Sequence, residues 1–281
     1  MKLISYLYNR KEYLGFIHQE RIFCLRSVNG KLPATMDAFL RDWHHYLPLA
    51  KEVEWHIHAH PALQSTGFWM DEVQLLAPVP RPVSLQDGSV FRNHHAVTGP
   101  GNISCMPDHF EDLDFECQAA AVICKKGRNI PAGRADEYIG GLLIMNDFYT
   151  RKFQTHFASS LGPFLITTDD LRSFEIPCKE NHVGRNWNLP VSCLLNGLPL
   201  GDDNLGNMDR TFAEIIERAS YGVDLYPGDI IIGGGAVPQD FSNRSIEPGD
   251  EITLCIEGLG ELKNTVIKTD FNFSPGKQKK N

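Results

Sequence analysis

Positive charge is scarce in this sequence relative to negative charge. The 281 residues include 27 Lys and Arg against 35 Asp and Glu, which gives a formal net charge of −8 at pH 7. Proteins that grip nucleic-acid phosphates do so through clustered Lys and Arg side chains. We therefore predict that nucleic acid is not a partner of this protein.

Long apolar runs and paired cysteines are also missing. No segment approaches the roughly 18 uncharged apolar residues of a membrane-spanning helix, and residues 1–11 lack the apolar stretch of a secretory signal. We expect a cytoplasmic protein with no membrane partner. The seven cysteines are irregularly spaced and include no C-x-x-C pair, which fits neither a disulfide framework nor a structural zinc site.

What the sequence does contain is typical of a folded, loop-rich protein. Hydrophobic residues make up 42% of the chain, together with 24 Gly and 17 Pro, and the length suffices for a sizeable core. Short apolar runs bounded by turn residues predict strands at 119–124, 141–145, 164–167, 191–195, 230–232 and 252–256. Residues 211–220 have helical spacing. The predicted class is α+β, dominated by strands.

Three prolines at 78, 80 and 82 mark the predicted domain boundary, because they prevent a helix and favour an extended linker. Residues 1–75 are predicted to form a small amino-terminal domain, rich in strands and with helical spacing between residues 36 and 54. Residues 76–270 form the larger, strand-dominated domain. The tail at 271–281 has no apolar residue to bury after position 273 and is predicted to be disordered.

Oxygen-bearing side chains alternate along one predicted strand. In LDFECQ, residues 113–118, strand periodicity turns Asp114, Glu116 and Gln118 to one face. About 30 residues later, Asp147 would come from a neighbouring strand. Because Mg²⁺ and Ca²⁺ prefer several oxygen ligands, Glu116, Gln118 and Asp147 form a candidate cation site. An exposed strand face with acidic residues is the structural alternative.

Several motifs in order resemble the fumarylacetoacetate hydrolase family. They span residues 75 to 268 and include LDFE at 113–116, ADEYIGG at 135–141, MND at 145–147, SLGPF at 160–164, NG at 196–197, LYPGDII at 225–231, EPGDE at 247–251 and IEGLG at 256–260. The resemblance implies a mixed β-sandwich or β-roll catalytic domain, preceded by a small amino-terminal domain and assembled as a homodimer.

The resemblance also implies an activity and a cofactor. Typical members cleave a carbon–carbon bond in acylpyruvate or β-diketo acid substrates, with Mg²⁺ or a similar cation such as Mn²⁺ or Ca²⁺ stabilising an enolate. Others decarboxylate, isomerise or tautomerise related oxo acids. The expected partner is therefore a small oxo acid. A diverged member that works as a decarboxylase, isomerase or biosynthetic cyclase, or that is catalytically silent, is the rival expectation.

Individual roles follow from the matched motifs. The family's cation ligands correspond to Glu116, Gln118 and Asp147, and an additional upstream Asp corresponds to Asp87. The catalytic base corresponds to His94, seven residues after Asp87, with the adjacent His95 as the competing choice. Arg151 and Gln154 match the pair that holds the substrate. For Arg151 the alternative is a surface ion pair.

The sequence departs from the family at positions that bear on this activity. Gln118 stands where a second Glu is usual, so it adds an oxygen without a charge and should weaken cation binding. A family Lys falls on Thr155 or His156. Gly235, in the substrate-binding turn, replaces a Thr hydroxyl, and the segment after His94 is shortened.

Two other patterns resemble sites. His56, His58 and His60 alternate as a metal-binding trio would on a strand, but on a helix they would spread around the axis, and we expect an exposed or packing role. By alternation, Cys117 faces away from Glu116, which argues against a nucleophile there.

Overall fold

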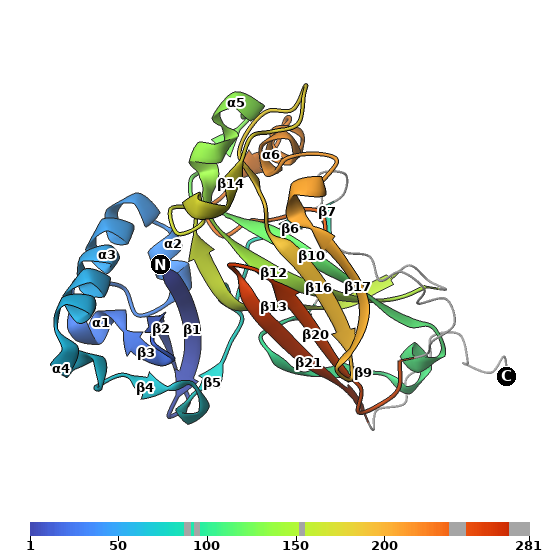
Figure 1. Cartoon of the computed structure of the whole chain (residues 1–281), viewed down its shortest axis with the longest axis horizontal. Helices are drawn as coiled ribbons and strands as arrows, with labels where there is room; N and C mark the ends of the chain where they lie inside the picture. The colour runs from blue at the N-terminus through green and yellow to red at the C-terminus, as the bar shows by residue number, and fades with distance from the viewer. Residues whose placement is uncertain (87–90, 93–95, 152–154, 236–245, 270–281) are drawn as a thin grey trace, which may run out of the picture.

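The computed structural model describes residues 1–86, 91–92, 96–151, 155–235 and 246–269. The amino-terminal part begins with a meander of three strands, continues with helices, and returns to short strands (Figure 1). Its elements are β1 (Lys2–Tyr8), β2 (Lys11–His18), β3 (Arg21–Cys24), α1 (Leu25–Val28), α2 (Met36–Leu40), α3 (Trp43–Ala59), α4 (Pro61–Gln64), β4 (Phe68–Trp69), η1 (Met70–Glu72) and β5 (Gln74–Leu75). The strands and the helices predicted between residues 36 and 54 are confirmed.

A large mixed sheet runs through the molecule in the order β4-β3-β2-β1-β13-β12-β10-β19-β6-β7, with β5 on β1 and β8 on β13. The later strands of this sheet are β6 (Leu85–Gln86), β7 (Phe91–Arg92), β8 (Ala96–Thr98), β10 (Leu113–Ile123), β12 (Ile139–Thr150), β13 (Thr155–Thr167) and β19 (Ile230–Ile232). Since β1 pairs with β13, amino-terminal and later strands share one sheet. The residues from 76 to 84 form neither helix nor strand, as the prolines predict, and the division of the chain near residue 75 stays a proposal.

A second sheet packs against the first (Figure 1). Its order is β17-β16-β20-β21-β9. The bounds are β9 (Gly101–Cys105), β16 (Pro190–Leu195), β17 (Leu198–Asn204), β20 (Glu251–Ile256) and β21 (Gly260–Lys268). Two short pairs join β11 (Gly127–Arg128) to β18 (Asp224–Leu225) and β14 (Glu175–Ile176) to β15 (Asn186–Trp187).

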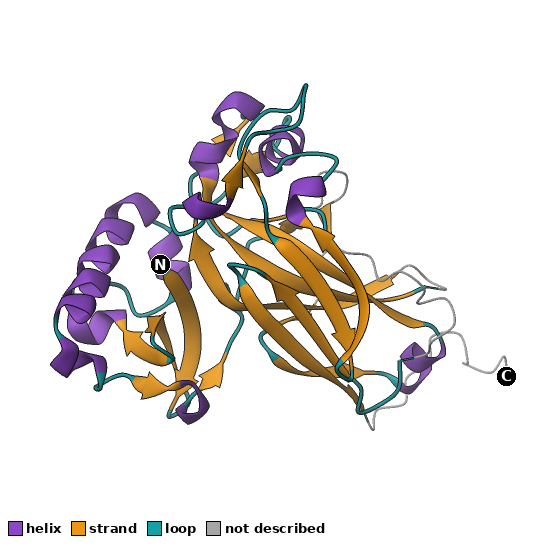
Figure 2. Cartoon of the chain, viewed as in Figure 1, coloured by secondary structure: helices purple, strands orange, loops and turns teal. Residues whose placement is uncertain are grey.

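Helices in this later part are short. They are η2 (Pro107–Glu111), α5 (Ala132–Ala135), η3 (Asp136–Tyr138), η4 (Arg172–Phe174), η5 (Leu205–Asn207) and α6 (Phe212–Ala219). The helix predicted at 211–220 is confirmed as α6, and Thr211 and Glu214 cap its first turn reciprocally. Figure 2 shows how strands dominate the molecule, which confirms the α+β class.

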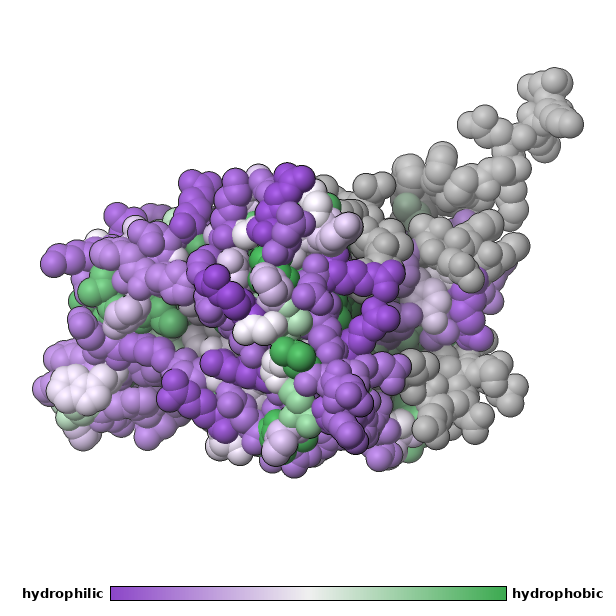
Figure 3. All heavy atoms as spheres, turned by 90° about the horizontal axis from the view of Figure 1, so that it is seen from above, coloured by the Kyte–Doolittle hydropathy of each residue, from purple (hydrophilic) through white to green (hydrophobic). Residues whose placement is uncertain are grey.

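Two hydrophobic cores lie on opposite faces of β10. Ala119 and Ala121 face the core between the two sheets, whereas Ala120 and Val122 face the core shared with the amino-terminal helices. β10 and β12 are therefore covered on both faces over much of their length, which fixes their register. The outer surface seen in Figure 3 is mainly hydrophilic, with apolar side chains in small separate places. Among the described residues, no helix combines the length and apolar character needed to cross a bilayer.

Candidate functional site

The first half of β10 and the second half of β12 carry a row of polar side chains. Glu116 lies directly opposite Asp147 in the antiparallel register, and Gln118 is two residues further along β10. Because cross-strand partners and alternate residues share a face, all three side chains occupy one face of the sheet. The structure thus brings together the three oxygen-bearing residues that the sequence analysis singled out.

The Gln118 side-chain amide forms a hydrogen bond through its nitrogen, and its oxygen has no partner among the described residues. Its Nε2 donates to Glu116 Oε2 at 2.9 Å, which turns the amide oxygen away from that carboxylate. Oε1 is buried and has no hydrogen-bond partner among the described residues. A buried acceptor without a donor costs about 1–3 kcal/mol, so an oxygen in this position is suited to a ligand that accepts its lone pair.

Asp147 is fully buried and held by two side chains from β13. Ser159 Oγ donates to Oδ1 at 2.8 Å, and His156 Nδ1 lies 2.6 Å from Oδ2. The contact to His156 depends on a bulge in β13. The pairs Phe148 with Ala158 and Tyr149 with His156 leave Phe157 as an extra residue. This bulge turns His156 to the same face as Asp147.

A second polar group extends the row at the other end. Asp114 Oδ2 accepts from Tyr149 Oη at 3.0 Å and from Arg151 Nε at 3.2 Å, and its Oδ1 accepts from the backbone of Phe115. The pKa of Tyr149 is raised, mainly because the side chain is buried and secondly because the negative charge of Asp114 is near. Tyr149 is therefore a neutral donor. Arg151 forms the ion pair that was the structural alternative, and its side chain remains 40% exposed.

Gly235 packs against the edge of β10 beside the polar row. A Cβ added at this position would overlap the carbonyl oxygen of Cys117, which belongs to the backbone and cannot turn away. Backbone approach therefore requires glycine here. Any contact of residue 235 with a substrate would come from its backbone.

A cavity of about 220 Å³ borders Gly235. Val191, Leu205 and Met208 contribute apolar walls, and Asp203, Asn204, Asn207, Asp209 and Gly234 complete the lining. The cavity therefore lies beside the turn whose backbone approaches Cys117 and Gln118.

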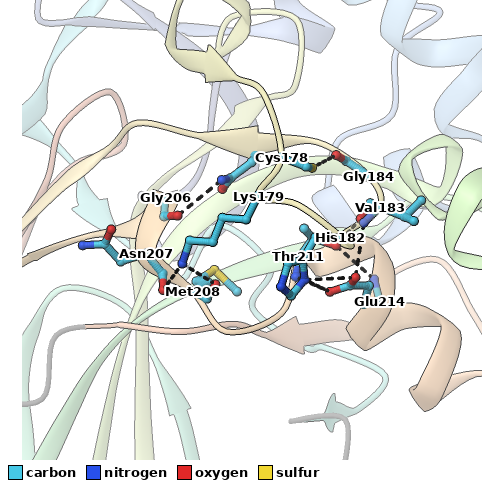
Figure 4. Close-up of polar contacts among 11 residues, drawn as sticks. Cys178, Lys179, His182, Val183, Gly184, Gly206, Asn207, Met208, Thr211 and Glu214 are labelled. Carbon is cyan, nitrogen blue, oxygen red and sulfur yellow. Dashed lines mark hydrogen bonds and ion pairs between the residues drawn. The ribbon is translucent and has the colours of Figure 1, made fainter.

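Figure 4 shows how a neighbouring loop contacts Asn207 and Met208, two residues that line this cavity. Lys179 Nζ donates to the backbone carbonyls of Asn207 at 2.8 Å and Met208 at 3.2 Å. Further along the loop, His182 Nδ1 lies 3.0 Å from Glu214 Oε2 at the start of α6. These contacts tie residues 179–183 to both the cavity wall and α6.

Comparison with known families agrees with this architecture. The family described as Fumarylacetoacetate (FAA) hydrolase C-terminal matches residues 69–267, which is more than half of the chain. The chain belongs to the fumarylacetoacetate hydrolase family. The resemblance noted in the sequence is thereby confirmed.

Two bacterial relatives share moderate identity with this family member. An uncharacterized protein of Staphylococcus epidermidis is 32% identical over 189 residues, and one of Staphylococcus saprophyticus is 33% identical over 187 residues. These alignments cover 60% and 59% of this chain but only 58% and 57% of the relatives. The chain thus matches little more than half the length of either relative.

Solved structures share the fold of this family member at low identity. Maleylpyruvate hydrolase from Sphingobium sp. SYK-6 superposes with a TM-score of 0.73 at 20% identity, over 96% of this chain and 100% of that chain. The 5-carboxymethyl-2-hydroxymuconate delta-isomerase from Mycobacterium smegmatis gives 0.65 at 20% identity over the same shares. One structure of the Sphingobium enzyme contains manganese(II) and pyruvate. At these identities the likeness establishes the fold.

The polar row fits a divalent cation when the Gln118 amide is counted. No three His, Cys, Asp or Glu side chains of the described residues are placed to hold a metal ion. Two carboxylates and a buried amide oxygen with no partner in the described part of the chain, however, are the kind of oxygen ligands that Mg²⁺ and Mn²⁺ accept. A carboxylate such as that of Asp147 has about four acceptor positions, so contacts with Ser159 and His156 are compatible with a role as a cation ligand.

Four predicted site residues, Asp87, His94, His95 and Gln154, lie outside the described residues. The chain re-enters the described part at Ala96, where β8 pairs with Ala158 of β13. This strand therefore lies beside the segment of β13 that carries His156 and Ser159. His156 was noted in the sequence only as a possible replacement for a family Lys, and its contact with Asp147 depends on the bulge.

The remaining patterns are structural in the described part of the chain. His56 and His58 lie in α3. The His56 ring contacts the His60 ring in a tilted arrangement with centroids 4.3 Å apart, whereas the His58 ring meets the His18 ring edge-on at 4.1 Å. The trio is therefore divided between two pairs. Cys117 is buried in the core between the sheets, on the face opposite Glu116.

Proposed function

We propose that this protein is a divalent-cation-assisted enzyme that cleaves a carbon–carbon bond in a small acylpyruvate or β-diketo acid. The observation that carries the proposal is the polar row in which Glu116, Gln118 and Asp147 share one face, with a buried amide oxygen that finds no partner among the described residues. Family membership supports it, as does the shared fold with a maleylpyruvate hydrolase whose structure contains manganese(II) and pyruvate.

Each residue in this proposal has a distinct task. Glu116, Gln118 and Asp147, with Asp87, would hold Mg²⁺ or Mn²⁺ through oxygen atoms, and the bound cation would supply Lewis acidity to an oxo acid. His156 and Ser159 fix the orientation of Asp147. Arg151, oriented by Asp114, and Gln154 would bind the substrate carboxylate.

The base in this proposal is His94 or His95. It would take a proton from the water that attacks the acyl carbonyl, so that the carbon–carbon bond breaks and its electron pair leaves as an enolate. Protonation of the enolate then gives pyruvate beside the carboxylic acid. A homodimer in the cytoplasm, with no nucleic-acid or membrane partner, belongs to the same proposal.

A second candidate is a decarboxylase, isomerase or cyclase that forms an enolate without attack by water. The neutral Gln118 and the side-chain-free Gly235 favour it, because each removes a polar contribution that the family usually has. A homologue without catalytic activity would be the extreme result of the same loss of polar groups. The isomerase from Mycobacterium smegmatis shows that this fold occurs in a non-hydrolytic enzyme.

The test is an assay of acetylpyruvate cleavage with added Mg²⁺ or Mn²⁺, in which pyruvate is measured by coupled reduction to lactate. We expect turnover that EDTA abolishes, and losses of about a hundredfold in Glu116→Gln and Asp147→Asn. Gln74→Glu, on an exposed position of β5, is the control. Turnover of oxaloacetate alone would favour the decarboxylase, and cation-independent turnover would overturn the proposal.

A further inference from the structure

The candidate site has three oxygen-bearing side chains in its row, but only two of them carry a negative charge. Glu116 and Asp147 are carboxylates, whereas Gln118 is a neutral amide that occupies the third position of the row. The next carboxylate on this face, Asp114, already pairs with Arg151. The charge available to a cation among these described residues is therefore that of two side chains.

The neighbours of Gln118 across the sheet, and the next residue on its face toward the end of β10, carry no charge. Its cross-strand partner is Met145, which pairs in turn with Leu161, and the next residue on its face is Ala120. All three are fully buried and apolar. On the remaining side lies the backbone of Gly235. Gln118 is therefore the last polar residue on this face of β10, and Glu116 is the last charged one.

The two carboxylates also have neighbours that would compete with a cation. The Gln118 amide donates to Glu116, and the Ser159 hydroxyl donates to Asp147, whose other oxygen lies 2.6 Å from His156. Each donor stabilises negative charge that a cation would otherwise use. A site with Glu at position 118 would carry one more negative charge, so the protein alone should bind a divalent cation more weakly than such a site.

We infer that Gln118 makes cation binding depend on an anionic oxo acid, which brings the missing negative charge into the site with its own oxygens. This inference rests on the proposed function and narrows its substrate class. The two ligands then bind cooperatively, since each raises the affinity of the other by the same factor. The preferred substrate carries a carboxylate beside its carbonyl group, and a neutral diketone of the same shape binds poorly.

The test compares three planar probes of similar size and decreasing charge. Oxalate, oxamate and oxamide carry two, one and no negative charges. Mn²⁺ binding to the full chain is measured by calorimetry, and free Mn²⁺ by its electron paramagnetic resonance signal, with each probe at a concentration whose own chelation of Mn²⁺ is known. We expect oxalate to increase Mn²⁺ affinity about tenfold or more, oxamate less, and oxamide hardly at all.

Two variants distinguish a negative charge added at the site from one added elsewhere on the protein. Gln118→Glu should increase affinity for Mn²⁺ alone about tenfold and reduce the effect of oxalate. Gln74→Glu adds the same charge on exposed β5 and should behave as the wild type. If Gln118→Glu does not fold, the order of the three probes on the wild type decides.

The outcomes distinguish the inference from the proposed function. Tight binding of Mn²⁺ to the wild type, equal with and without oxalate, would overturn the inference and leave the proposed function intact. Equal effects of oxalate and oxamide would do the same. Absence of Mn²⁺ binding even with millimolar oxalate would overturn both, because the site would then hold no cation.

Discussion

The two halves of β10 have the same backbone geometry and different surroundings. From Asp114 to Gln118, one face carries oxygen-bearing side chains, whereas from Ala120 to Val122 the same face packs into the core beneath the amino-terminal helices. The opposite face is apolar throughout, with Phe115 and Cys117 in the first half and Ala119 and Ala121 in the second. The polar face of the candidate site is therefore built as an extension of a rigid, doubly covered sheet.

The largest expected effect tests the border between these halves. Ala120→Glu and Gln118→Glu introduce the same side chain two residues apart on one face. Ala120 is fully buried, and we expect Ala120→Glu to lower the free energy of unfolding by about 4 kcal/mol or more. Gln118→Glu loses a hydrogen bond to a carboxylate and places a second negative charge beside Glu116, which together we expect to cost about 2 kcal/mol. Urea denaturation measures both, and equal losses would contradict the distinction between the halves.

A somewhat smaller effect tests the edge of the polar half. Gly235→Ala places a methyl group against the Cys117 carbonyl oxygen, so the turn or β10 must move. We expect a loss of about 3 kcal/mol in unfolding free energy. Gly30→Ala, whose added methyl group meets no atom within 4 Å, is the matched control and should change stability by less than about 0.5 kcal/mol. A tolerated Gly235→Ala would show that the close approach is not required.

The next effect tests the support of Asp147 by β13. His156→Ala removes one partner of a fully buried carboxylate, which we expect to cost about 2 kcal/mol. Tyr149→Phe removes only the hydroxyl that donates to Asp114 and should cost about 1 kcal/mol. Thermal unfolding monitored by circular dichroism compares the two. The reverse order would mean that Asp147 does not depend on the imidazole.

Local patterns predicted much of the sheet and part of the site. Alternation along residues 113–118 correctly placed Glu116 and Gln118 on one face and Cys117 on the other, because the period of a strand is a local property. The apolar run at 119–124 likewise corresponds to the half of β10 that is buried on both faces. The roles of these residues stay predictions.

Features that depend on pairing between distant strands were beyond such patterns. Counted back from Ser159 by strict alternation, His156 falls on the opposite face, and only the extra residue Phe157 returns it to Asp147. The close approach of Gly235 to Cys117 joins segments more than 100 residues apart. Pairing of β1 with β13, which places amino-terminal and later strands in one sheet, also has no local signal.

The smallest expected effect concerns the loop beside the site cavity and depends on pH. Burial would raise the pKa of Glu214, but hydrogen bonds from His182 and from the backbones of Thr211 and Val183 outweigh it and lower that pKa. A lowered pKa in the folded state means that the ionised Glu214 stabilises the fold above its ordinary value near 4.3, and that this stabilisation is lost as the pH falls through the folded value.

We therefore expect Glu214→Gln to lower the free energy of unfolding by about 1 kcal/mol at pH 7 and by less at pH 3.5. Urea denaturation at both pH values measures the difference, and Glu180→Gln, on an exposed residue of the same loop, is the control. This loop contacts Asn207, Met208 and α6, whereas the polar row is carried by β10, β12 and β13, so the variant should keep its Mn²⁺ affinity with oxalate. A loss that does not depend on pH would show that Glu214 acts through its shape and neutral hydrogen bonds, and a loss of Mn²⁺ affinity would couple the loop to the site.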